Sequence, residues 1–133
     1  MERKSEYYKS YGASFRIIGE DLPFEEIEST LGFVATYKHR KGNKRGTHVL
    51  EDDRWTLESP LSEDKELGEH LEWLWSKLLS QKQYLVGLKD KHHLDVFAGY
   101  RSDCDHCGTV ISAQGMKICY EFDIPLELSI VIA

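Results

Sequence analysis

The stretch YGASFRIIGEDLPFEEIESTLG, residues 11–32, changes its hydrophobic period halfway along. Over residues 11–19 apolar and polar side chains alternate, which is typical of a strand with one buried face. Over residues 21–32 apolar side chains recur at helical spacing, with Pro23 suited to the first turn of a helix and Gly32 to its end. The stretch therefore predicts a strand followed directly by a helix, so the fold contains both kinds of element.

The same two periods continue along the chain. The longest helical stripe lies within residues 63–80, and further helical patterns run to about residue 90 and over residues 113–122. Alternating segments predict more strands, at residues 33–40, 54–59, 93–100 and 126–133. We therefore predict a single-domain α+β sandwich in the order β-α-β-β-α-β-α-β, with helices packed on one side of a mainly antiparallel sheet. Residues 1–10 are expected to form a flexible N-terminal segment, and residues 11–133 the domain.

The periods also predict which side chains face the core in the last two elements. On the helix over residues 113–122, we expect Met116, Cys119 and Phe122 to face inward. On the final strand, one face is uniformly apolar and the other is mixed, so the mixed face should be less deeply covered. The apolar face consists of Leu126, Leu128, Ile130 and Ile132.

Composition and charge limit the classes of function. The 133 residues are 41% hydrophobic and 30% charged, as in an ordinary globular domain. The net charge of −6 argues against nonspecific binding to nucleic acid, and it suits a protein partner with a basic surface. The apolar runs are too short to span a membrane, no apolar segment typical of a secretory signal follows the start, and three cysteines cannot all pair. We therefore expect a cytoplasmic protein.

Several features in a fixed order resemble the DUF4279 family, a set of small bacterial domains. An acidic helix ends in Leu-Gly, a basic Lys-Gly turn follows, and then come a strand with a tryptophan and a long helix that begins near a histidine. In this sequence these features are Leu31-Gly32, Lys41-Gly42, Trp55 and His70. The resemblance extends from about Tyr11 to Ile132. It implies the architecture and supplies no catalytic residue.

The loop RSDCDHCGT, residues 101–109, contains the most reactive side chains of the chain. Cys104, His106 and Cys107 could contribute to a zinc site, but such a site usually takes four ligands and only one cysteine pair is present. Redox chemistry is less favoured, because the residues after Cys107 begin a helix poorly. The sequence therefore favours a polar turn with free thiols and no obligatory cofactor, with zinc as the alternative. The loop does not belong to the pattern that resembles DUF4279.

The segment YKHRKGNKR, residues 37–45, concentrates positive charge. It could bind a phosphate or an acidic patch through Arg40, Lys41, Lys44 and Arg45. Acidic residues follow closely at positions 51–53 and could neutralise it. A solvated hairpin tip is the favoured interpretation, and an anion site is the alternative.

The acidic face of the long helix carries the main functional hypothesis. The sequence contains no nucleophile elbow, no phosphate-binding glycine loop and no His-Glu-x-x-His motif, so an enzyme is not favoured. We expect a protein-binding module, such as an immunity-type protein that neutralises a basic partner. The helix would steer the partner and anchor it through Glu66, Glu69, Glu72 and Trp73. The alternative is a small-ligand or metal-binding domain that uses the His-Arg-Lys-Gly turn and the cysteine loop, and a third possibility is a hydrolase or redox enzyme.

Overall fold

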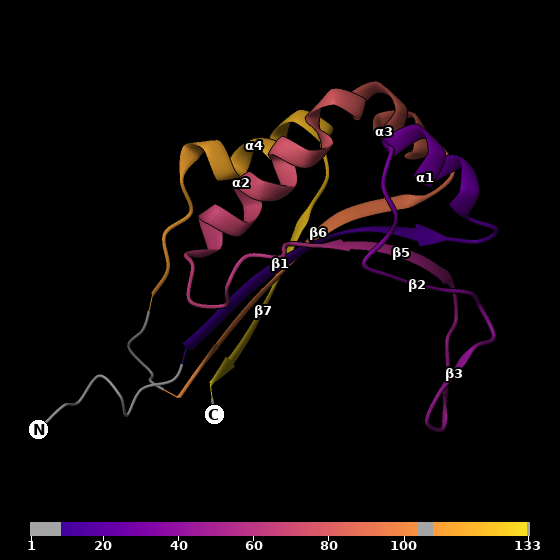
Figure 1. The fold of residues 1–133 in the computed structure, drawn as a ribbon. Helices are drawn as coiled ribbons and strands as arrows, with labels where there is room; N and C mark the ends of the chain where they lie inside the picture. Colours follow the sequence, from indigo (N-terminus) through magenta and orange to yellow (C-terminus); the bar gives the residue numbers. More distant parts are fainter. Residues whose placement is uncertain (1–8, 104–107, 133) are drawn as a thin grey trace, which may run out of the picture.

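A five-stranded sheet and a layer of helices make up the fold (Figure 1). A computed structural model describes residues 9–103 and 108–132. The sheet contains β1 (Lys9–Gly19), β2 (Tyr37–His39), β5 (Asp53–Glu58), β6 (His93–Ser102) and β7 (Leu126–Ile132). The helices are α1 (Phe24–Leu31), α2 (Leu67–Leu78), α3 (Lys82–Leu88) and α4 (Ala113–Phe122), with a 3-10 turn, Leu79–Gln81, between α2 and α3. A small hairpin consists of β3 (Lys44–Arg45) and β4 (His48–Val49).

The strand order is β2-β5-β1-β6-β7, with β1 at the centre. β1 pairs antiparallel with β5 and with β6, and β2 pairs antiparallel with β5. The last strand differs, because α4 crosses over and returns the chain parallel to β6. Figure 1 shows the helices together on one side of the sheet. The predicted α+β class, with a mainly antiparallel sheet covered by helices on one side, is confirmed.

The core lies between β1 and α2. Along β1 every second side chain is buried on the helix side, including Phe15 and Ile17, which are fully buried. The apolar stripe of α2 is also fully buried, as its helical period predicts. It consists of Leu67, Leu71, Leu74 and Leu78.

Several elements differ from their predicted bounds. β1 begins at Lys9, so two residues of the segment expected to be flexible belong to the sheet. The strand predicted over residues 33–40 is only three residues long, and the loop after it contains the β3–β4 hairpin. α4 has the predicted bounds, and Phe122 is buried and Cys119 partly buried as expected, but Met116 is 54% exposed, whereas Ile118 is fully buried. The expectation for Met116 was wrong because the contact of α4 with α2 sets its rotation.

That contact is a close approach of two helix backbones at Gly68 and Gly115. The N–H of Gly68 donates to the carbonyl of Val110 over 2.9 Å. A Cβ atom on Gly68 would lie 2.8 Å from the backbone nitrogen of Ser112, and one on Gly115 would lie 2.8 Å from the carbonyl oxygen of Gly68. Backbone atoms cannot move aside as a flexible side chain can. Both positions therefore require glycine if α2 and α4 are to keep their spacing.

Replacing Gly68 by alanine should destabilise the fold even though alanine favours helices. We expect Gly68→Ala to lower the free energy of unfolding by about 1–3 kcal/mol, the usual cost of overpacking. The matched control is Gly87→Ala in α3, where an added Cβ meets nothing within 4 Å. Gly87→Ala should be neutral or stabilising by up to about 1 kcal/mol. Urea unfolding of the two variants measures the difference, and equal stabilities would contradict the close contact.

Candidate functional site

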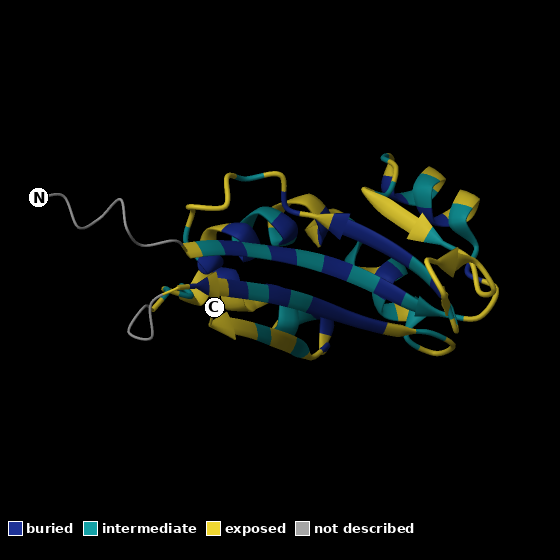
Figure 2. Cartoon of the chain, turned by 90° about the horizontal axis from the view of Figure 1, so that it is seen from below, coloured by how far each residue is buried: buried dark blue, intermediate teal, exposed yellow. Residues whose placement is uncertain are grey.

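Figure 2 shows that the described helices leave the opposite face of the sheet open. A hollow of about 450 Å³ lies at one end of this face. Small residues form its floor: Gly12 on β1 lies opposite Gly99 on β6, which lies opposite Ser129 on β7. A Cβ atom added to either glycine would meet nothing within 4 Å, so the space above the floor is open. Phe97 and Arg101 flank the floor on β6.

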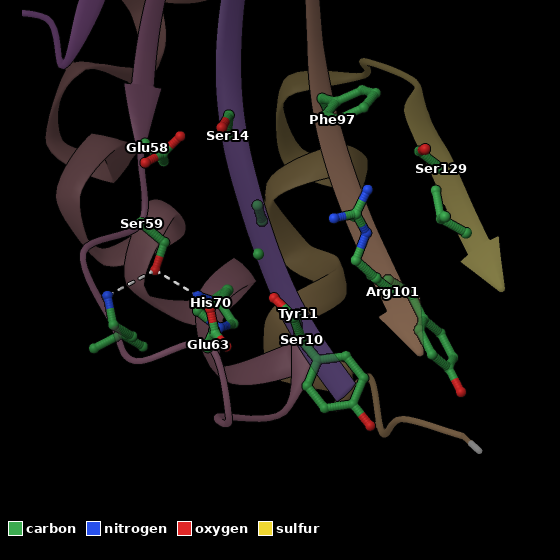
Figure 3. A pocket seen from close by; sticks show the side chains of 16 residues that line it. Ser10, Tyr11, Ser14, Glu58, Ser59, Glu63, His70, Phe97, Arg101 and Ser129 are labelled. Atoms are coloured by element: carbon green, nitrogen blue, oxygen red, sulfur yellow. Dashed lines mark hydrogen bonds between the residues drawn. The ribbon is translucent and has the colours of Figure 1, made fainter. Parts of the chain in front are cut away.

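Figure 3 shows the guanidinium of Arg101 extending along the sheet surface between β1 and β6. Arg101 is exposed. Ser10 and Ser14 on β1 and Ser129 on β7 add hydroxyl groups around it. The hollow therefore offers a cation, polar hydroxyls and the ring of Phe97 beside the edge of the sheet, where Val131 of β7 also lines it.

Ser59 and His70 form the inner wall of the hollow where β5 ends (Figure 3). The Ser59 Oγ and His70 Nδ1 atoms lie 2.8 Å apart and share a buried hydrogen bond. Burial lowers the pKa of His70, and the carbonyls of Ser62 and Lys65 oppose this only in part. His70 Nε2 is buried, and within the described residues it makes no hydrogen bond of good geometry. The pair resembles part of a catalytic triad, but no carboxylate in the described part of the chain bonds to Nε2, and Ser59 is only 7% exposed. It is therefore better suited to fixing the turn than to attacking a substrate.

The outer edge of β7 adjoins the hollow and carries the most apolar exposed surface of the sheet. Leu128, Ile130 and Ile132 are 47%, 57% and 54% exposed, although their side chains point to the helix side, where Ala98 and Tyr100 of β6 are buried. Figure 2 shows β7 largely in the colour of exposed residues. The alternation of the sequence correctly predicts that these side chains share one face, but the described helices leave that face of β7 exposed.

Along its outer edge, β7 also has backbone N–H and C=O groups that pair with no other described strand. The N–H of Val96 donates to the carbonyl of Pro125 over 3.0 Å. Because a parallel ladder engages every second residue of a strand, residues 127, 129 and 131 bond to β6. The N–H and C=O groups of Leu128, Ile130 and Ile132 therefore point away from the sheet. We call this row of groups, with their side chains, the free edge.

Acidic groups lie near the start of the free edge. Glu127 is 62% exposed and contacts Arg16 at 3.4 Å, and Asp123, whose side chain is 99% exposed, lies 3.6 Å from Lys89 Nζ. Arg16 is held mainly by Asp95, to which it donates two hydrogen bonds of 2.8 Å. Burial alone would raise the pKa of Asp95, but the hydrogen bonds and charge of Arg16 hold that pKa below its usual value. The charge of Glu127 is therefore only partly neutralised.

The acidic residues that the sequence assigns to a partner surface take part in the fold itself. Glu66 accepts hydrogen bonds of 2.7 Å from the Thr109 hydroxyl and from the Val110 N–H, which lower its pKa. Glu69 accepts the N–H of Glu66, and Glu72 accepts the Ser112 hydroxyl over 2.6 Å. The hydrogen bonds from Thr109, Val110 and Ser112 attach residues 109–112 to the N-terminal half of α2 and the residue before it. Trp73, the expected anchor, is partly buried and packs against the core.

The basic cluster is divided between structural and exposed residues. Arg40 donates to the buried carboxylate of Asp53 and to the carbonyl of Leu22, and its guanidinium lies 3.8 Å from the centre of the Phe24 ring. Lys41 donates its backbone N–H to Asp53 and pairs with Glu20 over 2.7 Å. Lys44 and Arg45 are exposed on β3. The four residues expected to bind one anion therefore do not converge on one site.

The predicted metal ligands Cys104, His106 and Cys107 lie outside the described residues. Within residues 9–103 and 108–132, no cluster of three or more His, Cys, Asp or Glu side chains is placed to hold a metal ion. Cys119 is partly buried, and burial raises the pKa of its thiol, which makes it a weak nucleophile. In the same ranges, no helix combines the length and apolar character needed to cross a membrane.

Two features of the site, the Ser59–His70 pair and the free edge, were not predicted from the sequence. The Ser59–His70 pair depends on how the turn after β5 meets α2, which no motif records. The free edge does leave a signal, because Ile130, Val131 and Ile132 are consecutive apolar residues in a strand without lysine, arginine or proline.

Comparison with known proteins gives one match. The family described as Domain of unknown function (DUF4279) matches residues 6–132, nearly the whole chain. No curated protein and no solved structure matches.

The lowered pKa of His70 predicts a loss of stability in mild acid. Below its ordinary pKa of 6.5, the unfolded chain takes up a proton that the folded chain does not. The free energy of unfolding should therefore fall as the pH drops from 6.5 toward the folded-state pKa, by up to about 1.4 kcal/mol per pH unit. In His70→Gln this part of the pH dependence should disappear. Urea unfolding across this pH range measures it, and an unchanged slope in the variant would show that His70 titrates normally.

Proposed function

Because the chain belongs to the DUF4279 family, whose description names no activity, we propose a function from the site itself: the protein binds another protein through the free edge of β7. The bound partner contributes an extended segment that adds a sixth strand to the sheet. The role agrees with the protein-binding module expected from the sequence, but it uses β7 instead of the acidic face of α2.

The observation that carries the proposal is the unprotected free edge. Natural proteins usually protect an outer strand with charged residues, proline, bulges or a covering element. β7 reads LELSIVI, and three of its outward-bonding residues are about half exposed. Met116 and Tyr120 of α4, which immediately precedes β7 in the chain, are 54% and 83% exposed and add to the apolar surface. Exposed apolar surface of this kind is typical of interaction sites.

Charge supports a basic partner. The acidic side chains of Asp123 and Glu127 lie near the start of β7, and the whole chain carries a net charge of −6. Antiparallel pairs outnumber parallel pairs in proteins, so we propose an antiparallel partner strand. Its C-terminal end then lies beside Glu127, and lysine or arginine there complements the acidic end. A module of this kind could neutralise a basic protein as immunity-type proteins do.

The hollow adjoins the free edge and would enlarge the surface available to the partner. Ser129 and Val131 belong to β7 and line the hollow on the uncovered face of the sheet. Side chains of the partner strand that point to this face of the sheet can therefore reach the hollow. Glu58 and Glu63 line its other side, which again favours basic groups on the partner.

The proposal predicts where a strand-forming peptide binds. As probe we choose a synthetic peptide of alternating valine and threonine with two lysines at its C-terminal end. On binding, the amides of Leu128 and Ile130 should become protected from hydrogen exchange, whereas those of residues 127, 129 and 131 already bond to β6 and should change little. Ile130→Lys should weaken binding by at least about tenfold, because it places a charge opposite apolar side chains. NMR-detected titration and exchange measure both effects.

Val34→Lys is the matched control, since Val34 is 70% exposed and lies in the loop between α1 and β2. It should leave peptide binding unchanged. A peptide with its lysines at the N-terminal end should bind more weakly. Equal effects of the two lysine variants, or protection confined to α2, would contradict strand addition at β7. If sedimentation shows a dimer that Ile130→Lys dissociates, a second copy occupies the edge and the basic partner is wrong.

A further inference from the structure

A second cavity lies at the opposite edge of the sheet, between β2, β5 and the β3–β4 hairpin. Its volume is about 270 Å³. In the ladder His39 of β2 lies opposite Arg54 of β5, and both side chains line the cavity. Tyr37, Arg45, His48 and Asp52 also contribute to the wall. Because β2 and β7 are the two outer strands, this hairpin cavity is separate from the proposed protein-binding edge.

Two buried nitrogen atoms in the hairpin cavity have no acceptor. His39 Nε2 and Arg54 Nε are inaccessible to solvent and make no hydrogen bond with the described residues. The His39 side chain is only 10% exposed. The nearest carboxylate is that of Asp52, whose Oδ1 lies 3.9 Å from His39 Nε2 and 3.8 Å from Arg54 Nη2, beyond hydrogen-bond distance. Buried donors are nearly always satisfied in folded proteins, so these two atoms call for an acceptor beyond the described residues.

The neighbouring tyrosine favours a donor role for His39. The Tyr37 hydroxyl lies 3.1 Å from His39 Nδ1. A phenol that donates to Nδ1 leaves the ring proton on Nε2, the atom without an acceptor. The Arg45 guanidinium is held nearby, 5.0 Å from the centre of the Tyr37 ring. A neutral His39 in this arrangement, Arg45 and Arg54 all present N–H groups to the same cavity.

We propose that the hairpin cavity binds the phosphate group of a small phosphorylated ligand. A tetrahedral oxyanion can accept hydrogen bonds from several directions, and guanidinium groups match its geometry well. The volume leaves space for a group attached to the phosphate. Two guanidiniums on the wall oppose a cation at the same place. Asp52 and Glu51 also line the cavity and offset part of the positive charge, so affinity comes mainly from the directed hydrogen bonds and is modest.

This site differs from the anion site predicted from the basic cluster. Arg45 belongs to both, but Arg40 and Lys41 are held by Asp53 and Glu20 outside the hairpin cavity. The proposed site uses His39 and Arg54 instead of Arg40 and Lys41. Lys44 precedes Arg45 on β3 and does not line the cavity, which provides a matched control.

The test is a titration of the full chain with inorganic phosphate, followed by NMR of the His39 ring nitrogens and the Arg54 Nε–H group. Phosphate should shift both signals with a single affinity. Arg45→Ala should weaken this binding by about tenfold, as expected for the loss of a charge-assisted hydrogen bond. Lys44→Ala removes the same charge from the same strand and should change the affinity less than about twofold, because it removes only screened, nonspecific attraction.

Three results would overturn the proposal. Equal weakening by Arg45→Ala and Lys44→Ala would reduce the effect to general surface charge. Acetate binding as tightly as phosphate would assign the cavity to carboxylates. A long-lived water contacting His39 Nε2, with no response of either signal to phosphate, would show that water satisfies the donors. His39→Gln, which keeps a donor group, should retain measurable binding, and His39→Phe should lose most of it.

Discussion

The contact between the backbones of α2 and α4 determines how far the helix layer extends across the sheet. Gly68 and Gly115 bring the two helices so close that no side chain fits between them. Of this pair, α2 packs over the central strand β1, whose Phe15 and Ile17 are fully buried. Among the described elements, none covers the C-terminal part of β7, although the side chains of that part point toward the helix side. The exposed apolar edge therefore follows from the tightness of the core packing.

Two acidic residues of this chain, Asp53 and Glu66, stabilise loops. Asp53 is 3% exposed and accepts hydrogen bonds from the N–H groups of Leu22 and Lys41 and from Arg40, so it ties the loop before α1 to the loop after β2. Burial opposes its ionisation, but these donors hold its pKa below the usual value. Glu66 performs a similar task for residues 109–110. A charge run in the sequence consequently overstates the charge that remains available to a partner.

Periodicity predicts the order and type of the main elements because it reports which side chains must be buried. The bounds of α4 follow from it, and so does the buried stripe of α2. It does not predict the rotation of α4, where Ile118 is buried in place of Met116, because a backbone contact through Gly115 sets that rotation. Nor does it predict that Ile130 is exposed, because coverage of a strand depends on elements distant in sequence. The hairpin cavity likewise depends on the pairing of His39 with Arg54, which only the register of β2 and β5 provides.

The two outer strands solve the same physical problem in different ways. An outer strand presents unpaired backbone groups, which favour association with other chains unless they are protected. β2 is three residues long, carries Lys38 and is followed by the β3–β4 hairpin, and short charged strands of this kind resist pairing. β7 is seven residues long and mostly apolar, its one charged residue, Glu127, lies near its start, and no described element pairs with its outer edge. An unprotected strand carries a risk of aggregation, so its presence beside a fully formed core is best explained by a partner that normally covers it. The protected edge, in contrast, encloses a small polar cavity, so the sheet separates the proposed protein-binding edge from the proposed anion site.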